Sequence, residues 1–203
     1  MSVGQVPAHG CNLSTNERQA VNLLRVSCFR TLAVPPLRTG CGDGLFSESL
    51  ASAPSLVATL STVSTSSVSL TGVDVSSALL ECARATRSYR ELCRHDLNKP
   101  GALVDGFNED TFDAAVCVGV LTYIDPSNVP DLLCQMACIV KPGGVVVYTC
   151  RTDMSAAWDA RAAELEAQMM WEQTARLEEV PYLPNNPDYA GDIEMNICAY
   201  TVL

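Results

Sequence analysis

Short apolar runs alternate with longer amphipathic segments along most of the chain. Runs of about four to eight apolar residues between turn residues are typical of strands buried on both faces of a sheet. The sequence predicts such buried strands at Thr111–Gly119 and Val145–Cys150. It also predicts a strand in the β-rich run Val68–Val73, a short strand at Arg90–Leu97, and a short first strand at Leu37–Thr39. Two further β-prone stretches, near 171–180 and 193–202, flank a Pro/Asn/Asp-rich loop at 181–192.

The segments between the strands predict helices. Ser14-Thr15-Asn16-Glu17 has the form of a capping box, which indicates a helix at about 15–32. Further helices are expected at 45–53, from Ser76 to about Thr86, from Asp125 to about Val140, and at about 155–170. Lys141-Pro142-Gly143-Gly144 is expected to be a turn.

The spacing of apolar residues predicts the buried faces of three helices. We expect these core positions to be Ala78, Leu79, Cys82 and Ala83 in the first; Leu132, Leu133, Met136, Ile139 and Val140 in the second; and Ala157, Leu165 and Met169 in the third.

Strands that alternate with helices predict the α/β class, with a Rossmann-like, mostly parallel sheet flanked by helices. The last two strands have no helix between them, so they are expected to form a C-terminal antiparallel hairpin. We expect a single domain over 1–203, with an N-terminal helix and irregular lead-in at 1–38. The Ser/Thr-rich stretch at 52–69 is expected to be an exposed insertion.

Composition narrows the possible partners. Hydrophobic residues make up 48% of the 203 residues and charged residues 18%, as in a soluble globular protein. Apolar runs fall well short of the roughly 20 residues that cross a bilayer, so no membrane partner is expected. The net charge of -10 argues against a nucleic-acid partner, because phosphate binding needs clustered Lys and Arg.

The ten cysteines are scattered and include no CxxC pair. We therefore expect buried, reduced thiols in a cytoplasmic protein and no metal site. Cys134 and Cys138 are four residues apart on a predicted helix and should share one face.

The segment Thr39-Gly40-Cys41-Gly42-Asp43-Gly44 precedes two acids, Asp74 and Asp96, that end the next predicted strands. Glycines let a backbone turn approach a ligand closely. A carboxylate at the end of the following strand can accept hydrogen bonds from both hydroxyls of a ribose. This order of glycines and acids predicts a nucleoside-cofactor site.

Two nucleoside cofactors compete for this site. A dinucleotide fingerprint requires a small residue one position after the last glycine, where this chain has Leu45, and the chain has no Tyr-x-x-x-Lys pair. An NAD(P)-dependent oxidoreductase is therefore disfavoured relative to the second candidate, a protein that binds S-adenosylmethionine.

The Gly-x-Gly-x-Gly segment, Asp74, Asp96-Leu97 and the Lys-Pro-Gly-Gly sequence together resemble the class I S-adenosylmethionine-dependent methyltransferases over about 40–150. Within that family, the segments 112–123 and 148–153 and the tail Pro181-Tyr182-Leu183-Pro184 are most similar to the methyltransferase-like proteins of the Williams–Beuren region.

The resemblance implies a set of cofactor-binding residues: Gly40, Cys41, Gly42, Gly44, Asp74, Val75, Asp96, Leu97, Val118 and Tyr123. The glycines would pass beside the methionine portion, Asp74 would bind the ribose and Asp96 the adenine amino group. Val118, beside Gly119 at the end of the fourth strand, would offer backbone to the cofactor. Tyr123 would lie near the methyl group or the substrate. The alternatives are a helix-capping acid for Asp74, a solvated loop acid for Asp96 and core packing for Tyr123. Asp113 is expected to be structural, at the opposite edge of the sheet.

Three features depart from the family pattern. Arg38 replaces an acid two residues before Gly40, Pro35-Pro36 falls at the first strand, and the Ser/Thr-rich insertion lengthens the segment up to Asp74.

The leading hypothesis is methyl transfer from S-adenosylmethionine to a small-molecule or protein acceptor. The alternative is a non-catalytic binding or regulatory protein of the same fold. The sequence assigns neither the acceptor, nor a catalytic residue, nor the oligomeric state.

Overall fold

The computed structural model describes residues 36–39, 41–42, 69–124, 132–181 and 193–203. Several predicted segments lie outside the described residues: the helices at 15–32 and 45–53, the start of the helix at Asp125, the insertion up to residue 68, and most of the loop at 181–192.

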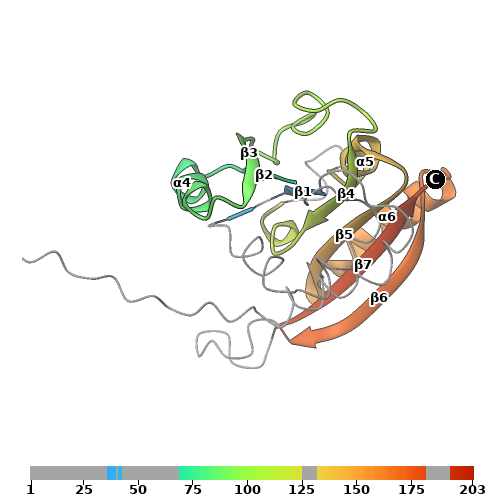
Figure 1. Ribbon diagram of the computed structural model, residues 1–203. Coiled ribbons are helices and arrows are strands. Elements are labelled where there is room, and N and C mark those ends of the chain that lie inside the picture. The colour runs from blue at the N-terminus through green and yellow to red at the C-terminus, as the bar shows by residue number, and fades with distance from the viewer. Residues whose placement is uncertain (1–35, 40, 43–68, 125–131, 182–192) are drawn as a thin grey trace, which may run out of the picture.

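The described residues form a seven-stranded sheet with the order β3-β2-β1-β4-β5-β7-β6 (Figure 1). Its strands are β1 Pro36–Thr39, β2 Leu70–Asp74, β3 Tyr89–Arg94, β4 Phe112–Cys117, β5 Val140–Arg151, β6 Trp171–Pro181 and β7 Glu194–Val202. The helices are α4 Ser77–Ala85, α5 Leu132–Ile139 and α6 Ser155–Ala167, with 3-10 turns η1 Leu121–Tyr123 and η2 Thr152–Met154. Strands β1 to β5 are parallel, and β7 is antiparallel to both β5 and β6. The predicted α/β class and the C-terminal hairpin are confirmed.

The short strand β1 occupies the centre of the sheet. Leu37 is in register with Thr71 of β2 on one side and Ala115 of β4 on the other. Pro36 is the first residue of β1. A proline at a strand start removes little from the ladder, so the strand forms despite the Pro-Pro sequence.

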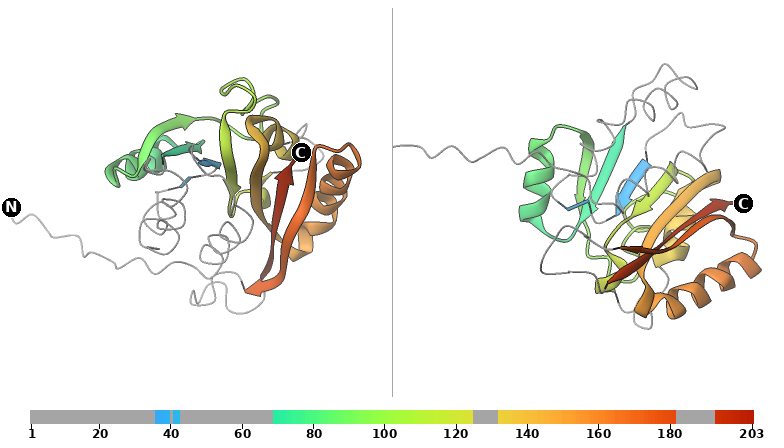
Figure 2. Two further views of the ribbon diagram at one scale, coloured as in Figure 1. Left: turned by 45° about the vertical axis from the view of Figure 1, so that its right-hand side comes forward. Right: turned by 90° about the horizontal axis from the view of Figure 1, so that it is seen from below.

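Alternate residues of the central strands supply two cores. One face contributes Ala115, Val146 and Tyr148 to the cluster that contains α5 and α6. The other face contributes Val116 and Val147 to a second cluster. Tyr89 packs against this second cluster and also against the residues under α4, so α4 lies on the opposite face from α5 and α6. Figure 2 shows α6 running along the outer strands of the sheet.

The predicted buried face of α4 is partly wrong. Leu80 and Ala83 are its buried residues, whereas Leu79 is 40% exposed. Ala78 and Cys82, also predicted to be buried, are exposed. Because α4 covers the edge of the sheet at β2 and β3, only a narrow stripe of the helix meets the core.

The prediction for α6 also needs correction. Its buried residues are Trp158, Ala162 and Leu165, which recur at helical spacing. Ala157 lies on the exposed side, and Met169, which is 71% exposed, comes after the helix has ended. The core residues predicted for the helix before β5 are all buried, although the last of them, Val140, is the first residue of β5.

The predicted turn at Lys141-Pro142-Gly143-Gly144 lies inside a strand instead. β5 begins at Val140 and continues through these residues, and its register with β4 shifts between Phe112 and Ala114. Gly143 has a φ of 79°. A bulge with glycine at positive φ takes up the extra residues without ending the strand. In β3 the strand is shorter than predicted and ends at Arg94.

Candidate functional site

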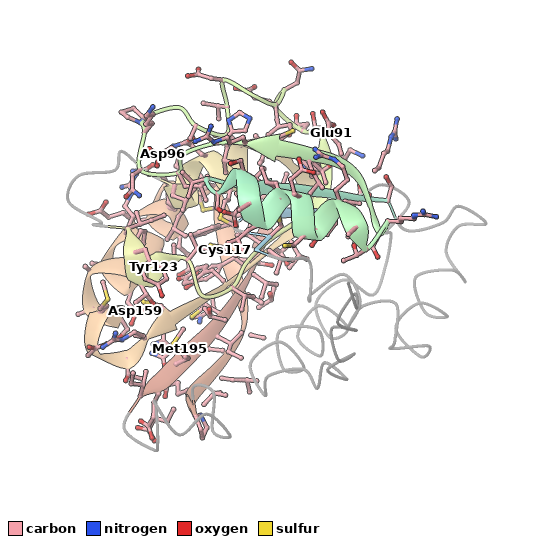
Figure 3. All side chains as sticks on the ribbon, turned by 90° about the vertical axis from the view of Figure 1, so that its left-hand side faces the viewer. Glu91, Asp96, Cys117, Tyr123, Asp159 and Met195 are labelled. Atoms are coloured by element: carbon pink, nitrogen blue, oxygen red, sulfur yellow. The ribbon has the colours of Figure 1, made fainter. Side chains whose placement is uncertain are left out.

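The predicted site residues that the structure describes follow the carboxyl ends of the parallel strands. Because β1 to β4 run the same way, their ends meet at one edge of the sheet. The chain also reverses its strand order at β1, which has β2 on one side and β4 on the other. Open α/β sheets bind ligands at such a switch point. In Figure 3, Asp96 and Tyr123 lie toward the same side of the molecule.

Asp74 joins two parts of this edge. Its Oδ2 accepts a hydrogen bond from the Gly42 N–H at 2.9 Å, and its Oδ1 accepts one from the Ser76 N–H, also at 2.9 Å. Ser76 in turn caps α4 by accepting from the Leu79 N–H at 3.3 Å. The helix-capping alternative therefore describes one oxygen of Asp74. The other oxygen binds the glycine turn, 32 residues earlier in the chain.

The glycine turn is held against β2. The Cys41 N–H donates to the Val73 carbonyl at 2.8 Å. Gly42 has a φ of +56°, and no atom lies within 4 Å of where its Cβ would be. The backbone conformation, together with open space at this position, accounts for a glycine here. Gly40 and Gly44 lie outside the described residues.

A cavity of about 300 Å³ opens beside Asp74. Its lining residues are Asp74, Val75, Leu79, His95, Asp96, Leu97, Asn98, Val118, Gly119, Val120, Tyr123 and Ile124. Six of the predicted residues thus share one cavity: Asp74, Val75, Asp96, Leu97, Val118 and Tyr123. An apolar cavity with a few converging polar groups is the common form of a small-molecule site.

The floor and the mouth of the cavity differ in exposure. Leu97 is buried, and Ile124 is only 2% exposed. Tyr123 is 76% exposed, so the alternative that it packs in the core is wrong. Asp96 is half-buried, and its Oδ1 accepts from the Asn98 N–H at 3.1 Å, which fixes the loop after β3.

Gly119 forms the wall after β4. It has a φ of +75°, and no atom lies within 4 Å of its Cβ position. Its N–H donates to Thr149 Oγ1 of β5 at 2.9 Å. The hydrogen bond holds the turn in place, and the missing side chain keeps the cavity open.

Sequence analysis missed five of the lining residues: Leu79, His95, Asn98, Val120 and Ile124. The helical pattern placed Leu79 in the core, although it faces this cavity. His95 directly precedes Asp96 at the end of a strand, and that adjacency was the available signal. Its ring also contacts Phe107, with 5.8 Å between ring centroids.

Other chemistry receives little support from the described residues. Burial raises the pKa of Cys150 to about 12 and of Cys198 to about 11, so both thiols stay protonated at neutral pH. No three His, Cys, Asp or Glu side chains within the described ranges are grouped to hold a metal ion. Among the helices that the structure describes, none has the length and apolar character to cross a membrane.

Asp113 lies at the other edge of the sheet, as expected for a structural acid. It is near the start of β4, and Lys141 Nζ is 3.0 Å from its Oδ1. It does not line the cavity.

Comparison with known proteins shows the family of the chain. A family model described as a methyltransferase domain matches residues 37–146, more than half of the chain. The chain is 28% identical over 135 residues to the ubiquinone biosynthesis O-methyltransferase of Pasteurella multocida (strain Pm70), covering 60% of this chain and 48% of that protein. It is 32% identical over 162 residues to methyltransferase-like protein 27 of Homo sapiens, covering 73% of this chain and 58% of that protein. The chain thus spans about half the length of the curated relatives it matches.

Solved structures share the fold at low identity. The [4+2]-cyclase SpnF has a TM-score of 0.62 at 13% identity, over 92% of this chain and 81% of that one. A geranyl diphosphate methyltransferase in complex with SAM has a TM-score of 0.57 at 14% identity, over 92% and 85%. Because one of these neighbours is a cyclase, the fold alone does not specify methyl transfer.

Proposed function

Because the chain belongs to the methyltransferase-domain family, we propose that it binds S-adenosylmethionine and transfers its methyl group to a small-molecule or protein acceptor. The observation that carries this proposal is the hydrogen bond from the Gly42 N–H to the Asp74 carboxylate beside the cavity. It brings the glycine turn and the acid at the end of β2 to one point, and a solved neighbour in complex with SAM has the same fold.

The polar groups of the site fit the ribose of this cofactor. Each carboxylate oxygen of Asp74 already accepts one backbone N–H. A carboxylate has about four lone-pair sites, so capacity remains for two hydroxyl donors. The two backbone bonds hold the carboxylate in place before the ligand arrives, which lowers the entropy lost on binding.

The apolar groups of the site fit a purine. Leu97 and Ile124 provide buried apolar surface, and Asp96 stands at the rim with a carboxylate. We propose that Leu97 packs on the adenine and Asp96 accepts from its amino group. Gly42 and Gly119, with open space at their Cβ positions, leave room for the ligand beside the main chain.

S-adenosylmethionine supplies a methyl group that its sulfonium already activates. The protein then has to hold an acceptor in line with that methyl group and exclude water, and correct positioning alone can supply about 7–11 kcal/mol of the barrier. Tyr123 lies exposed at the mouth of the cavity. Its ring can face a positive charge there. We assign no general base among the described residues.

Calorimetric titration of the full chain with S-adenosylmethionine and with S-adenosylhomocysteine tests the proposal. We expect one saturable site for each ligand and no heat with NADH. A cooperative unfolding transition on the same sample establishes that the chain is folded. Absence of binding by a folded sample, or binding of NADH instead, contradicts the proposal. Transfer of a labelled methyl group to candidate acceptors then identifies the acceptor class.

A further inference from the structure

Three sulfur atoms meet on the face of the sheet that α5 and α6 cover. Cys134 and Cys138 lie one turn apart on α5, with their Sγ atoms 3.9 Å from each other. The Cys134 thiol also donates to Met170 Sδ at 3.9 Å, and Met170 follows the end of α6. All three side chains are only partly buried, so a small ion can reach them.

We propose that Cys134, Cys138 and Met170 form a site for a soft monovalent metal ion, copper(I). Thiolate and thioether sulfurs are the ligands that select copper(I) over harder ions. Metal–sulfur bonds of about 2.3 Å, arranged in a plane around one ion, place the three sulfurs about 4 Å apart. Both sulfur–sulfur distances measured from Cys134 are 3.9 Å.

Cys134 and Cys138 are poorly placed to form a disulfide with each other. Residues four apart on a helix have Cβ atoms about 5–6 Å apart. A disulfide requires about 3.5–4.5 Å between these atoms. Direct bonding of Cys134 to Cys138 would therefore distort α5, whereas an ion between the sulfurs leaves the helix as it is.

The third ligand, Met170, comes from another part of the chain, and hydrogen bonds hold its backbone in place. The Met170 N–H donates to the Leu165 carbonyl at 3.0 Å, and its own carbonyl accepts from the Leu203 N–H at 3.0 Å. The unbranched side chain of methionine can still adjust by small rotations. A zinc ion would require a fourth ligand, and the described residues contain no group of three His, Cys, Asp or Glu suited to a metal.

The site lies away from the cavity described above. The Cys138 carbonyl accepts from the Asp110 N–H at 3.1 Å, just before β4 begins. The cluster is thus near the amino ends of the strands, while the cavity is at their carboxyl ends. Binding converts two thiols to thiolates, so one copper(I) ion displaces two protons and no electron is transferred.

Titration of the reduced full chain with copper(I), under anaerobic conditions and against a coloured copper(I) chelator, tests the proposal. We expect one equivalent that competes with the chelator in the wild type and is lost in the double variant C134S/C138S. The matched control C82S/C93S removes two other thiols, one exposed and one half-buried, and should keep that equivalent. The variant M170L conserves volume and should weaken binding by about tenfold or more, since loss of outer ligand partners alone costs about 10–100-fold.

X-ray absorption by the copper-loaded wild type supplies a readout that does not depend on how the variants fold. Three sulfur neighbours at about 2.3 Å are expected. The proposal is overturned by a tight equivalent that survives C134S/C138S, by its loss in C82S/C93S, or by a two-sulfur environment that M170L leaves unchanged. Titration with S-adenosylhomocysteine should give the same affinity with and without copper, so the two proposals fail separately.

Discussion

Two buried acids stand at opposite ends of the strands that flank β1. Asp74 ends β2 and is 9% exposed; Asp113 is near the start of β4 and is 7% exposed. Asp113 faces a cation, with Lys141 Nζ 3.0 Å away. Asp74 instead accepts from two backbone N–H groups and borders a cavity. Equal burial therefore does not indicate an equal role, because the partners decide whether a carboxylate is still able to bind a ligand.

The main chain around the two acids differs in the same way. A Cβ at Gly144 would lie 2.6 Å from the Asp113 carbonyl, so the amino edge is closely packed there. At the carboxyl edge, Cβ positions at Gly42 and Gly119 meet no atom within 4 Å. The main chain is therefore closely packed at Gly144, beside Asp113, whereas at Gly42 and Gly119 it leaves space for a ligand.

The largest expected effect comes from exchanging the two acids for amides. D74N should weaken S-adenosylhomocysteine binding by about 10–100-fold, because a hydrogen bond to a charged group contributes about 1.5–3 kcal/mol. D113N should leave the dissociation constant unchanged. Calorimetric titration of both variants measures the difference. Equal losses of affinity would show that Asp74 acts only through the stability of the fold.

Removal of the Lys141 ammonium group beside Asp113 should destabilise the protein without affecting cofactor binding. K141M leaves the Asp113 carboxylate buried without its partner, which should lower the free energy of unfolding by about 1–2 kcal/mol. Urea denaturation of K141M measures this. In the K141M background, D113N should recover part of the loss, and no recovery would mean that Lys141 stabilises through packing of its stem.

Two glycines with nearly the same positive φ allow the effect of backbone strain to be separated from that of ligand contact. Gly119 has a φ of +75° and Gly143 a φ of +79°, and both have open space at the Cβ position. Alanine at either position should cost about 1 kcal/mol of stability through backbone strain. Only G119A places a methyl group in the cavity, so only G119A should weaken cofactor binding. Equal affinities for G119A and G143A would place the ligand elsewhere.

The smallest effect is expected at the end of α6. Met169 has a φ of 58°, and the Met169 and Met170 N–H groups donate to the Glu166 and Leu165 carbonyls at 3.0 Å, the bonds of a Schellman cap. M169G should raise the free energy of unfolding by up to about 1 kcal/mol. Because its side chain is 71% exposed, little packing is lost. A lower midpoint in thermal unfolding would contradict this, and A163G, at an exposed position inside the helix, is the matched control that should destabilise.

Strands β4 and β5 were predictable because burial on both faces leaves apolar runs such as Val145–Cys150. Helix faces were less predictable. In α4, the run Ala78-Leu79-Leu80 offers two neighbouring apolar stripes, and only contact with β2 and β3 selects Leu80. The other apolar stripe contains Leu79, which lines the cavity.

The sequence by itself determined the order of the strands and helices that the structure describes, with Asp74 at the end of one strand and Asp113 at the start of another, because burial and turn chemistry act over a few neighbouring residues. Only the tertiary structure decided what each acid binds. Gly42 meets Asp74 across 32 residues, and Lys141 meets Asp113 across 28. Met170 likewise joins Cys134 across 36 residues. Such pairs depend on the register of parallel strands and on helix packing, and no local pattern records them.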